Sequence, residues 1–214
     1  HAPAVEVNLV NYQWPLLIVL FAGVLPAAHG GRRPTGWQLF GALLACAGSA
    51  LVLTGGEGQA GAPTSTTVPG DRIAGLAAAA LAAVIWAGYS VASRLYAGVP
   101  SLAVMGTCAL TAAGALVGHL AVETTTWPLT AGQWAGVVAQ GVGPVGLAFY
   151  LWDAGMKRGA LPLLGAAANL TPVLSTLLLA VAGRATLSWR LALAVALVAL
   201  GATIAGRATT RRAS

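Results

Sequence analysis

Polar and aromatic side chains recur at helical spacing inside the first long apolar stretch of the sequence. Four residues stand at i, i+3, i+4 and i+7 and therefore share one helical face: Asn8, Asn11, Tyr12 and Pro15. Amides that face lipid hydrocarbon lose their hydrogen bonds, which is costly. We therefore expect this face to look onto other helices or a wet cavity, where its amides can hydrogen-bond a small polar solute.

A second polar and aromatic face follows further along the chain. Trp86, Tyr89, Ser90 and Ser93 repeat the same spacing. Trp14 and Trp86 fall near the middle of their apolar stretches, whereas tryptophans of an interfacial belt stand near the ends. A packed bundle core with satisfied hydroxyls is the alternative interpretation. The two faces predict a substrate pathway lined by Asn11, Tyr12, Trp14, Trp86, Tyr89 and, from a later stretch, Asn169.

Prolines interrupt three of the apolar stretches and predict helix hinges at Pro15, Pro144 and Pro172. Asn11–Pro15 and Asn169–Pro172 each introduce an apolar run. Each run is followed by a short basic loop, a tryptophan (Trp37, Trp189) and a helix of small residues with a late glycine (Gly48, Gly201). The two copies lie five predicted helices apart and so run oppositely through the membrane. Inverted repeats with paired proline-interrupted helices are typical of transporters with a substrate site near the midplane.

Composition places the whole chain in a membrane. Of its 214 residues 57% are hydrophobic and 7% charged, against about 25% charged in soluble domains, and the mean hydropathy is +0.80. An all-α polytopic membrane protein is predicted, with seven spans of about 20 residues. They are Glu6–Leu25, Gly36–Leu53, Ile73–Tyr96, Leu102–Val122, Gln133–Met156, Leu161–Val181 and Trp189–Ala205.

The basic residues orient these spans. If the C-terminal tail is cytoplasmic, eight of the 11 Lys and Arg lie inside, which the positive-inside rule favours. The net charge of +6 does not indicate nucleic-acid binding, because these residues sit in short loops rather than in a patch with aromatics. We expect a multi-pass protein of the cell (inner) membrane, in contact with lipid. A monomer is favoured, although Gly114 and Gly118 form a GxxxG pair that suits a dimer face or packing within the bundle.

Other chemistries find little support. There is no catalytic Ser-His-Asp order, metal-ligand spacing or phosphate loop, so we expect no enzyme activity, metal or cofactor. Asp153 suits proton coupling, but its i, i+4 spacing to Lys157 favours an ion pair. His119 is expected to be a satisfied interface residue rather than a proton relay. Cys46 and Cys108, inside apolar stretches, are expected to be inert core residues.

Three segments carry a family resemblance: Asn8–Leu20, Ile85–Arg94 and Tyr150–Leu179. On them the chain resembles the drug/metabolite transporter superfamily in its EamA branch, and within it the exporters of aromatic amino acids. The resemblance implies ten helices in two inverted five-helix repeats around a central cavity, with this chain supplying the last seven and the first three missing. The acidic turn that the family often has after its proline helices is absent here, at Gly30–Arg33 and Gly183–Ala185.

The resemblance also implies a domain order. Residues 1–54 would be the last two helices of the first repeat, 55–72 an extracytoplasmic linker, 73–206 the second repeat and 207–214 a basic cytoplasmic tail. The function implied is export of small metabolites, above all aromatic or other amino acids, by alternating access through a central cavity. A non-transporting membrane assembly subunit or an inactive truncated fragment is the alternative.

Overall fold

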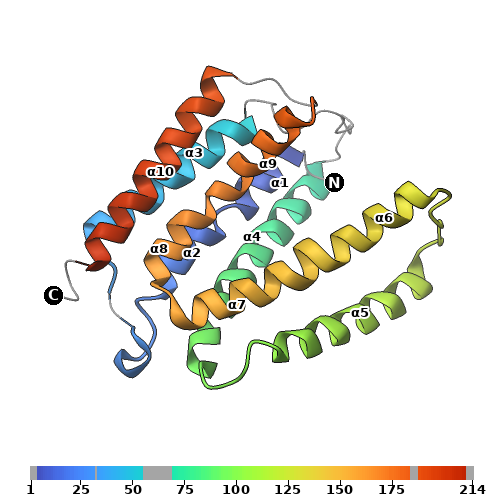
Figure 1. Ribbon diagram of the computed structural model, residues 1–214, viewed down its shortest axis with the longest axis horizontal. Helices are drawn as coiled ribbons and strands as arrows, with labels where there is room; N and C mark the ends of the chain where they lie inside the picture. Colours follow the sequence, from blue (N-terminus) through green and yellow to red (C-terminus); the bar gives the residue numbers. More distant parts are fainter. Residues whose placement is uncertain (1–3, 32, 55–68, 184–187, 211–214) are drawn as a thin grey trace. The chain divides into compact units, whose positions relative to one another are not determined.

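The computed structural model describes residues 4–31, 33–54, 69–183 and 188–210, and every regular element in these ranges is a helix (Figure 1). Most of the predicted linker 55–72, the end of the predicted tail and the basic residues Arg32 and Arg184 lie outside them. In chain order the elements are α1 (Ala4–Asn11), α2 (Trp14–Phe21), η1 (Ala27–His29), α3 (Gly36–Thr54), α4 (Pro69–Ala92), η2 (Ser93–Tyr96), α5 (Ala103–Val122), α6 (Ala131–Gln140), η3 (Gly141–Leu147), α7 (Ala148–Arg158), α8 (Leu161–Ala168), α9 (Leu170–Val181) and α10 (Trp189–Thr210).

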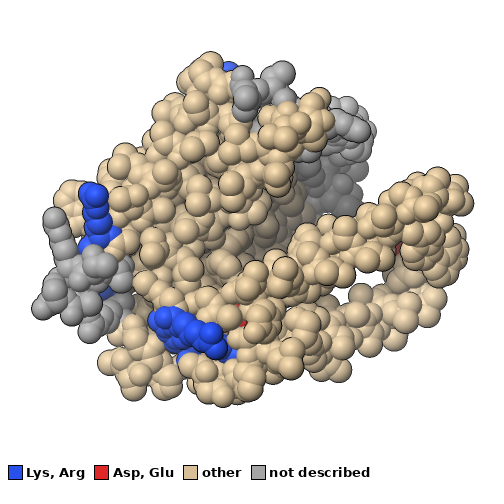
Figure 2. Space-filling model, in the orientation of Figure 1, with Lys and Arg blue, Asp and Glu red and all other residues tan. Residues whose placement is uncertain are grey.

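Four of the described helical segments are long and apolar enough to cross a membrane: Arg72–Tyr96, Ala103–Val122, Ala131–Arg158 and Trp189–Arg207. Shorter apolar helices occupy Val7–Phe21, Gly36–Val52 and Leu161–Ser175. Each of the seven segments overlaps one predicted span, although the first and sixth are shorter than predicted, and the expected all-α membrane protein is confirmed. Charged side chains are sparse on the face shown in Figure 2, as lipid-facing surfaces require.

Two of the predicted spans each consist of two helices in the structure. The first is divided into α1 and α2 at Tyr12–Gln13, and the sixth into α8 and α9 at Asn169. A proline follows each division, Pro15 in α2 and Pro172 in α9. Because proline has no N–H, the carbonyl four residues earlier loses its helical donor and the hydrogen-bond ladder is interrupted. We call these two sites the first and second helix breaks.

The predicted span around Pro144 behaves differently. The chain stays helical from Ala131 to Arg158, but Gly141–Leu147 is π-helical with Pro144 inside it. Proline has no N–H to donate to the carbonyl four residues earlier, and a single wider π turn lets the helix continue past it. Pro144 therefore does not divide the helix, but it lies in an irregular turn.

The chain forms two compact units, residues 1–95 with 159–214, and residues 96–158. In the first unit α3 packs closely on α10 through small residues (Figure 1). A Cβ added to Gly201 would stand 2.4 Å from the Gly41 carbonyl oxygen, and one added to Gly48 would stand 2.9 Å from that of Ala194. Since the later residue on α3 meets the earlier one on α10, the two helices cross antiparallel. A buried apolar cluster extends this contact: Ala45, Val52, Val173, Leu191, Ala194 and Val198.

In the second unit α5 contacts η3 and α7. The helical stretch from Ala131 to Arg158 in this unit begins with a capping box. The Thr130 hydroxyl accepts from the Gln133 N–H at 3.2 Å, and the Gln133 side-chain oxygen accepts from the Thr130 N–H at 3.1 Å. Apolar side chains of α5 and α6 are largely exposed, as in helices that face lipid. A Cβ added to Gly114 or Gly118 would meet open space, so packing on this pair within the described chain is not observed.

Candidate functional site

The first helix break is capped by its own residues. The Gln13 side-chain amide donates to the Leu9 carbonyl at 3.1 Å, and the Gln13 N–H donates to Val10 at 3.2 Å, a tight i−3 turn. The ladder resumes when the Leu17 N–H donates to the Gln13 carbonyl at 3.0 Å. The break therefore satisfies part of its backbone without water, while Asn11 and Tyr12 remain half-buried beside it.

Three aromatic rings meet next to this break. The Trp14 ring, on α2, stands edge-on to the Trp86 ring of α4, with centroids 6.2 Å apart and an interplanar angle of 90°. The Trp86 ring contacts that of Tyr89, one turn later on α4, at 5.6 Å and 35°. Both α1 and α2 pack on α4, which explains the meeting. We call Trp14, Trp86 and Tyr89 the aromatic cluster; all three side chains are partly exposed.

The structure therefore brings together three of the six predicted site residues, with Asn11 and Tyr12 at the adjoining break. T-shaped and tilted ring pairs leave edges and faces available for a further aromatic group. The half-buried amide of Asn11 and hydroxyl of Tyr12 add hydrogen-bonding capacity without a fixed charge. Such an arrangement is suited to binding a small, partly aromatic, uncharged or zwitterionic solute.

Asn169, the sixth predicted site residue, has a different environment. Its side chain is fully buried at the second helix break. The Ser49 hydroxyl of α3 lies 3.1 Å from Asn169 Oδ1 and 3.0 Å from the Asn169 carbonyl oxygen. The Asn169 amide nitrogen lies 3.3 Å from the Ala166 carbonyl oxygen. Its polar atoms are thus engaged by protein, and its role in lining a pathway stays a prediction.

Ser49 was not among the residues predicted from the sequence, and Cys46 was expected to be an inert core residue. Both lie on α3, one turn apart, and the Cys46 thiol hydrogen-bonds to the backbone of Leu16 and to the Asn169 side chain. Their i, i+3 spacing places both side chains on one side of a helix of small residues, and this pattern could have indicated a polar contact with a neighbouring helix. Only the packing of α3 shows that both residues reach the helix breaks.

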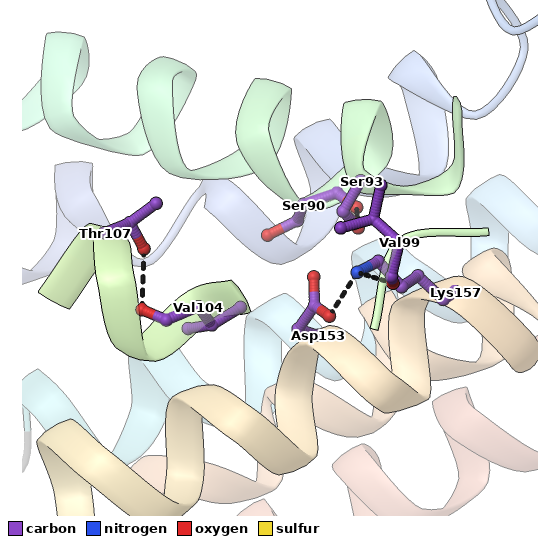
Figure 3. A network of polar contacts seen from close by, with 7 residues as sticks. All are labelled: Ser90, Ser93, Val99, Val104, Thr107, Asp153 and Lys157. Carbon is purple, nitrogen blue, oxygen red and sulfur yellow. Dashed lines mark hydrogen bonds and ion pairs between the residues drawn. The ribbon is translucent and has the colours of Figure 1, made fainter. Parts of the chain in front are cut away.

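Charged groups of the second unit form local contacts. The Lys157 ammonium lies 2.7 Å from Asp153 Oδ2 and donates to the Val99 carbonyl at 2.9 Å (Figure 3). The predicted Asp153–Lys157 ion pair is confirmed, and it ties the segment before α5 to α7. His119 contacts Glu123 and, at 2.9 Å, the Thr125 hydroxyl. Within the described ranges no group of three or more His, Cys, Asp or Glu is placed to hold a metal ion.

Comparison with known proteins gives these features a context. The model of the EamA-like transporter family matches residues 73–207, more than half of the chain. The chain belongs to this family. Because the match spans α4 to α10 and the chain consists of apolar helices, the protein is a membrane transporter by family.

Two relatives of this family carry a more specific name. The chain is 48% identical over 205 residues to the "Aromatic amino acid exporter YddG" of Ancylobacter novellus, covering 95% of this chain and 67% of that protein. It is 28% identical over 213 residues to the Escherichia coli protein of the same name, covering 99% of this chain and 70% of that protein.

A solved crystal structure is similar in fold. It matches with a TM-score of 0.82 and 46% sequence identity, over 95% of this chain and 67% of the solved chain. The helical arrangement described above is therefore one that occurs in a relative known from crystallography.

Proposed function

We propose that this EamA family member exports small metabolites, namely aromatic or other amino acids, through a pathway that passes the first helix break. The observation that carries the proposal is the aromatic cluster of Trp14, Trp86 and Tyr89, which stands beside the first helix break. The names of two relatives support the same substrate class.

The cluster supplies selectivity by ring contacts. An aromatic pair contributes about 0.5–1.5 kcal/mol beyond the burial of its area, and a substrate ring adds such a pair with Trp86. Asn11 and Tyr12 supply hydrogen bonds to the amino and carboxyl groups of the substrate. Neutral partners bind less tightly than an ion pair would, so the substrate can also be released.

The two helix breaks supply the movement. Pro15 and Pro172 stand in matched positions of helices that we infer to run oppositely, and the antiparallel crossing of α3 and α10 supports that inference. Each break is a place where a half-helix can tilt without rupturing a continuous ladder. We therefore propose alternating access in which α2 and α9 rock about these breaks. The C-terminal tail lies in the cytoplasm and the pathway crosses the inner membrane.

Counterflow in proteoliposomes tests the function. The full-length protein is reconstituted with unlabelled phenylalanine inside, and uptake of labelled phenylalanine is followed. Saturable uptake that tryptophan and tyrosine inhibit, but glutamate and lysine do not, is the expected result. Protein-free liposomes and a parallel preparation carrying Trp86→Ala are the controls.

Two results would count against the proposal. Uptake no greater than in protein-free liposomes, with a folded protein by gel filtration, would favour the non-transporting assembly subunit. Uptake inhibited equally by every amino acid would remove the aromatic cluster from the selectivity mechanism.

A further inference from the structure

Cys46 of α3 contacts both helix breaks, and Ser49 of α3 contacts the second. They are three residues apart, so they share one side of α3. The Cys46 thiol hydrogen-bonds to the backbone of Leu16, the residue directly after Pro15, and to the side chain of Asn169. Ser49 is buried and contacts Asn169 at two oxygens. Helix α3 thus contacts both interrupted spans at their breaks.

Asn169 is the centre of this contact because it replaces backbone bonds that the second break removes. Its amide nitrogen lies 3.5 Å from the Gly165 carbonyl oxygen and 3.3 Å from that of Ala166. The Asn169 N–H itself donates to Ala166, one residue short of the α-helical partner, at 3.3 Å. A side-chain amide is well suited to this task, since it offers two donors and one acceptor at once.

The Ser49 hydroxyl supplies the link across to α3. It has a single hydrogen and lies within reach of three acceptors: Asn169 Oδ1 at 3.1 Å, the Asn169 carbonyl at 3.0 Å and the Ala45 carbonyl at 3.3 Å. Its hydrogen can therefore shift between its own helix and Asn169 without leaving a buried donor unpaired. A contact with alternative acceptors tolerates a small tilt of α9 better than a single bond would.

We propose that Cys46, Ser49 and Asn169 form a polar bridge that couples the first helix break to the second, so that α2 and α9 tilt together during transport. The three act as positioning residues: none needs to touch the substrate, and Asn169 and Ser49 are too buried to do so in this structure. The inference rests on the proposed function, because it assigns a role in transport to contacts between the same two breaks.

Packing around the bridge supports coupling rather than free movement. A Cβ added to Gly165, on α8, would stand 2.8 Å from the Pro15 carbonyl oxygen. The backbone of the first break therefore already touches the half-helix that precedes the second. The polar bridge adds direction to this contact, because hydrogen bonds constrain angle as well as distance.

The test compares variants that remove one polar group each. Ser49→Ala and Cys46→Ala delete single groups, and Cys46→Ser retains a hydrogen-bonding group in place of the thiol. Thr107→Ala is the matched control, since the Thr107 hydroxyl also donates to a backbone carbonyl, that of Val104 in its own turn, at 2.8 Å and belongs to neither predicted pathway face. Each protein is purified as the full-length chain and compared at equal folded fraction.

The first measurement separates transport rate from binding. We expect Ser49→Ala and Cys46→Ala to lower the maximal counterflow rate about tenfold, the effect of losing one buried hydrogen-bonded group, with phenylalanine affinity changed less than about twofold. Cys46→Ser should recover most of the rate. Thr107→Ala should match the wild type in both. The double variant Ser49→Ala with Asn169→Ala should lose no more than the worse single variant, because both act through one bridge.

The second measurement reports the coupling itself. Hydrogen–deuterium exchange is followed in segments 8–21 and 161–175, with and without phenylalanine. In the wild type both segments should change together, and in Ser49→Ala only segment 8–21, next to the aromatic cluster, should respond. Joint responses of both segments in Ser49→Ala, with wild-type rates, would overturn the bridge and leave the proposed function standing. Absence of phenylalanine binding and flux in the wild type would overturn both.

Discussion

At the residue scale, Trp86 holds the central place in the aromatic cluster because its ring contacts both Trp14 and Tyr89. Trp37 shows the contrast: it is 68% exposed, and its ring contacts that of Phe40, three residues later on α3, with centroids 6.2 Å apart. The two tryptophans therefore have different expected roles, one in selectivity and one in a belt at the membrane interface.

Replacing Trp86 by alanine should weaken phenylalanine binding roughly tenfold, since a loss of about 1.4 kcal/mol in contact energy is one decade in affinity. The measurement is equilibrium binding to the full-length protein in detergent, compared at equal folded fraction.

Trp37→Ala is the matched control and should leave affinity nearly unchanged. Equal losses for the two variants would mean that the aromatic cluster contributes packing alone, and the interpretation of these faces as a bundle core would be preferred.

At the element scale, the two broken helices differ from an ordinary proline-started helix. Pro162 stands in the first turn of α8, which the extended residue Ala160 precedes, and at this position a backbone N–H would have no helical partner in any case. Pro15 and Pro172 each follow another stretch of helix instead, so each removes a bond that the chain would otherwise make. The role of Pro144 as a hinge stays a prediction, although its π turn marks the position.

Pro15→Ala and Pro172→Ala should each restore a backbone donor, favour a continuous helix and slow counterflow several-fold, while membrane insertion and expression stay at wild-type levels. Rates are measured in the same proteoliposomes as above. Pro162→Ala is the control and should transport normally; wild-type rates for all three variants would remove the breaks from the mechanism.

At the scale of the whole molecule, the predicted repeats and the compact units do not coincide. The first unit joins α1–α4 with α8–α10 and so draws helices from both predicted repeats, because α3 packs on α10. Contacts between the predicted repeats therefore hold this part of the chain together in addition to contacts within each, such as those of α2 with α3 and of α8 with α10. The division into repeats at residues 55–72 and the orientation in the membrane remain predictions.

The orientation can be checked by labelling intact cells with a membrane-impermeant maleimide. Single cysteines at Arg33 and Arg158 should stay unlabelled, because positively charged loops are retained in the cytoplasm, and one at Ser65 in the predicted linker should react. The parent protein, with its native Cys46 and Cys108, gives the background. Strong labelling at Arg33 with none at Ser65 would reverse the orientation.

Local pattern in the sequence was sufficient for several features. Apolar runs of membrane-spanning length predicted the helices, the i, i+4 spacing predicted the Asp153–Lys157 ion pair, and the spacing of Trp86 and Tyr89 placed both on one face of α4. Each is a short-range property, since the period of the helix and the chemistry of the residues determine it. The meeting of Trp14 with Trp86 was expected only as two faces at similar depth.

Tertiary structure alone decided which of the polar residues are exposed and which are enclosed. Asn11 and Asn169 both precede a proline and look alike in sequence, yet Asn11 is half-buried at its break and Asn169 is enclosed against Ser49. Helical periodicity gives the direction of a side chain within its own helix, but not which neighbour lies in that direction. Close approach of α3 to the second break makes that choice, and it turns a predicted pathway residue into the centre of a polar bridge.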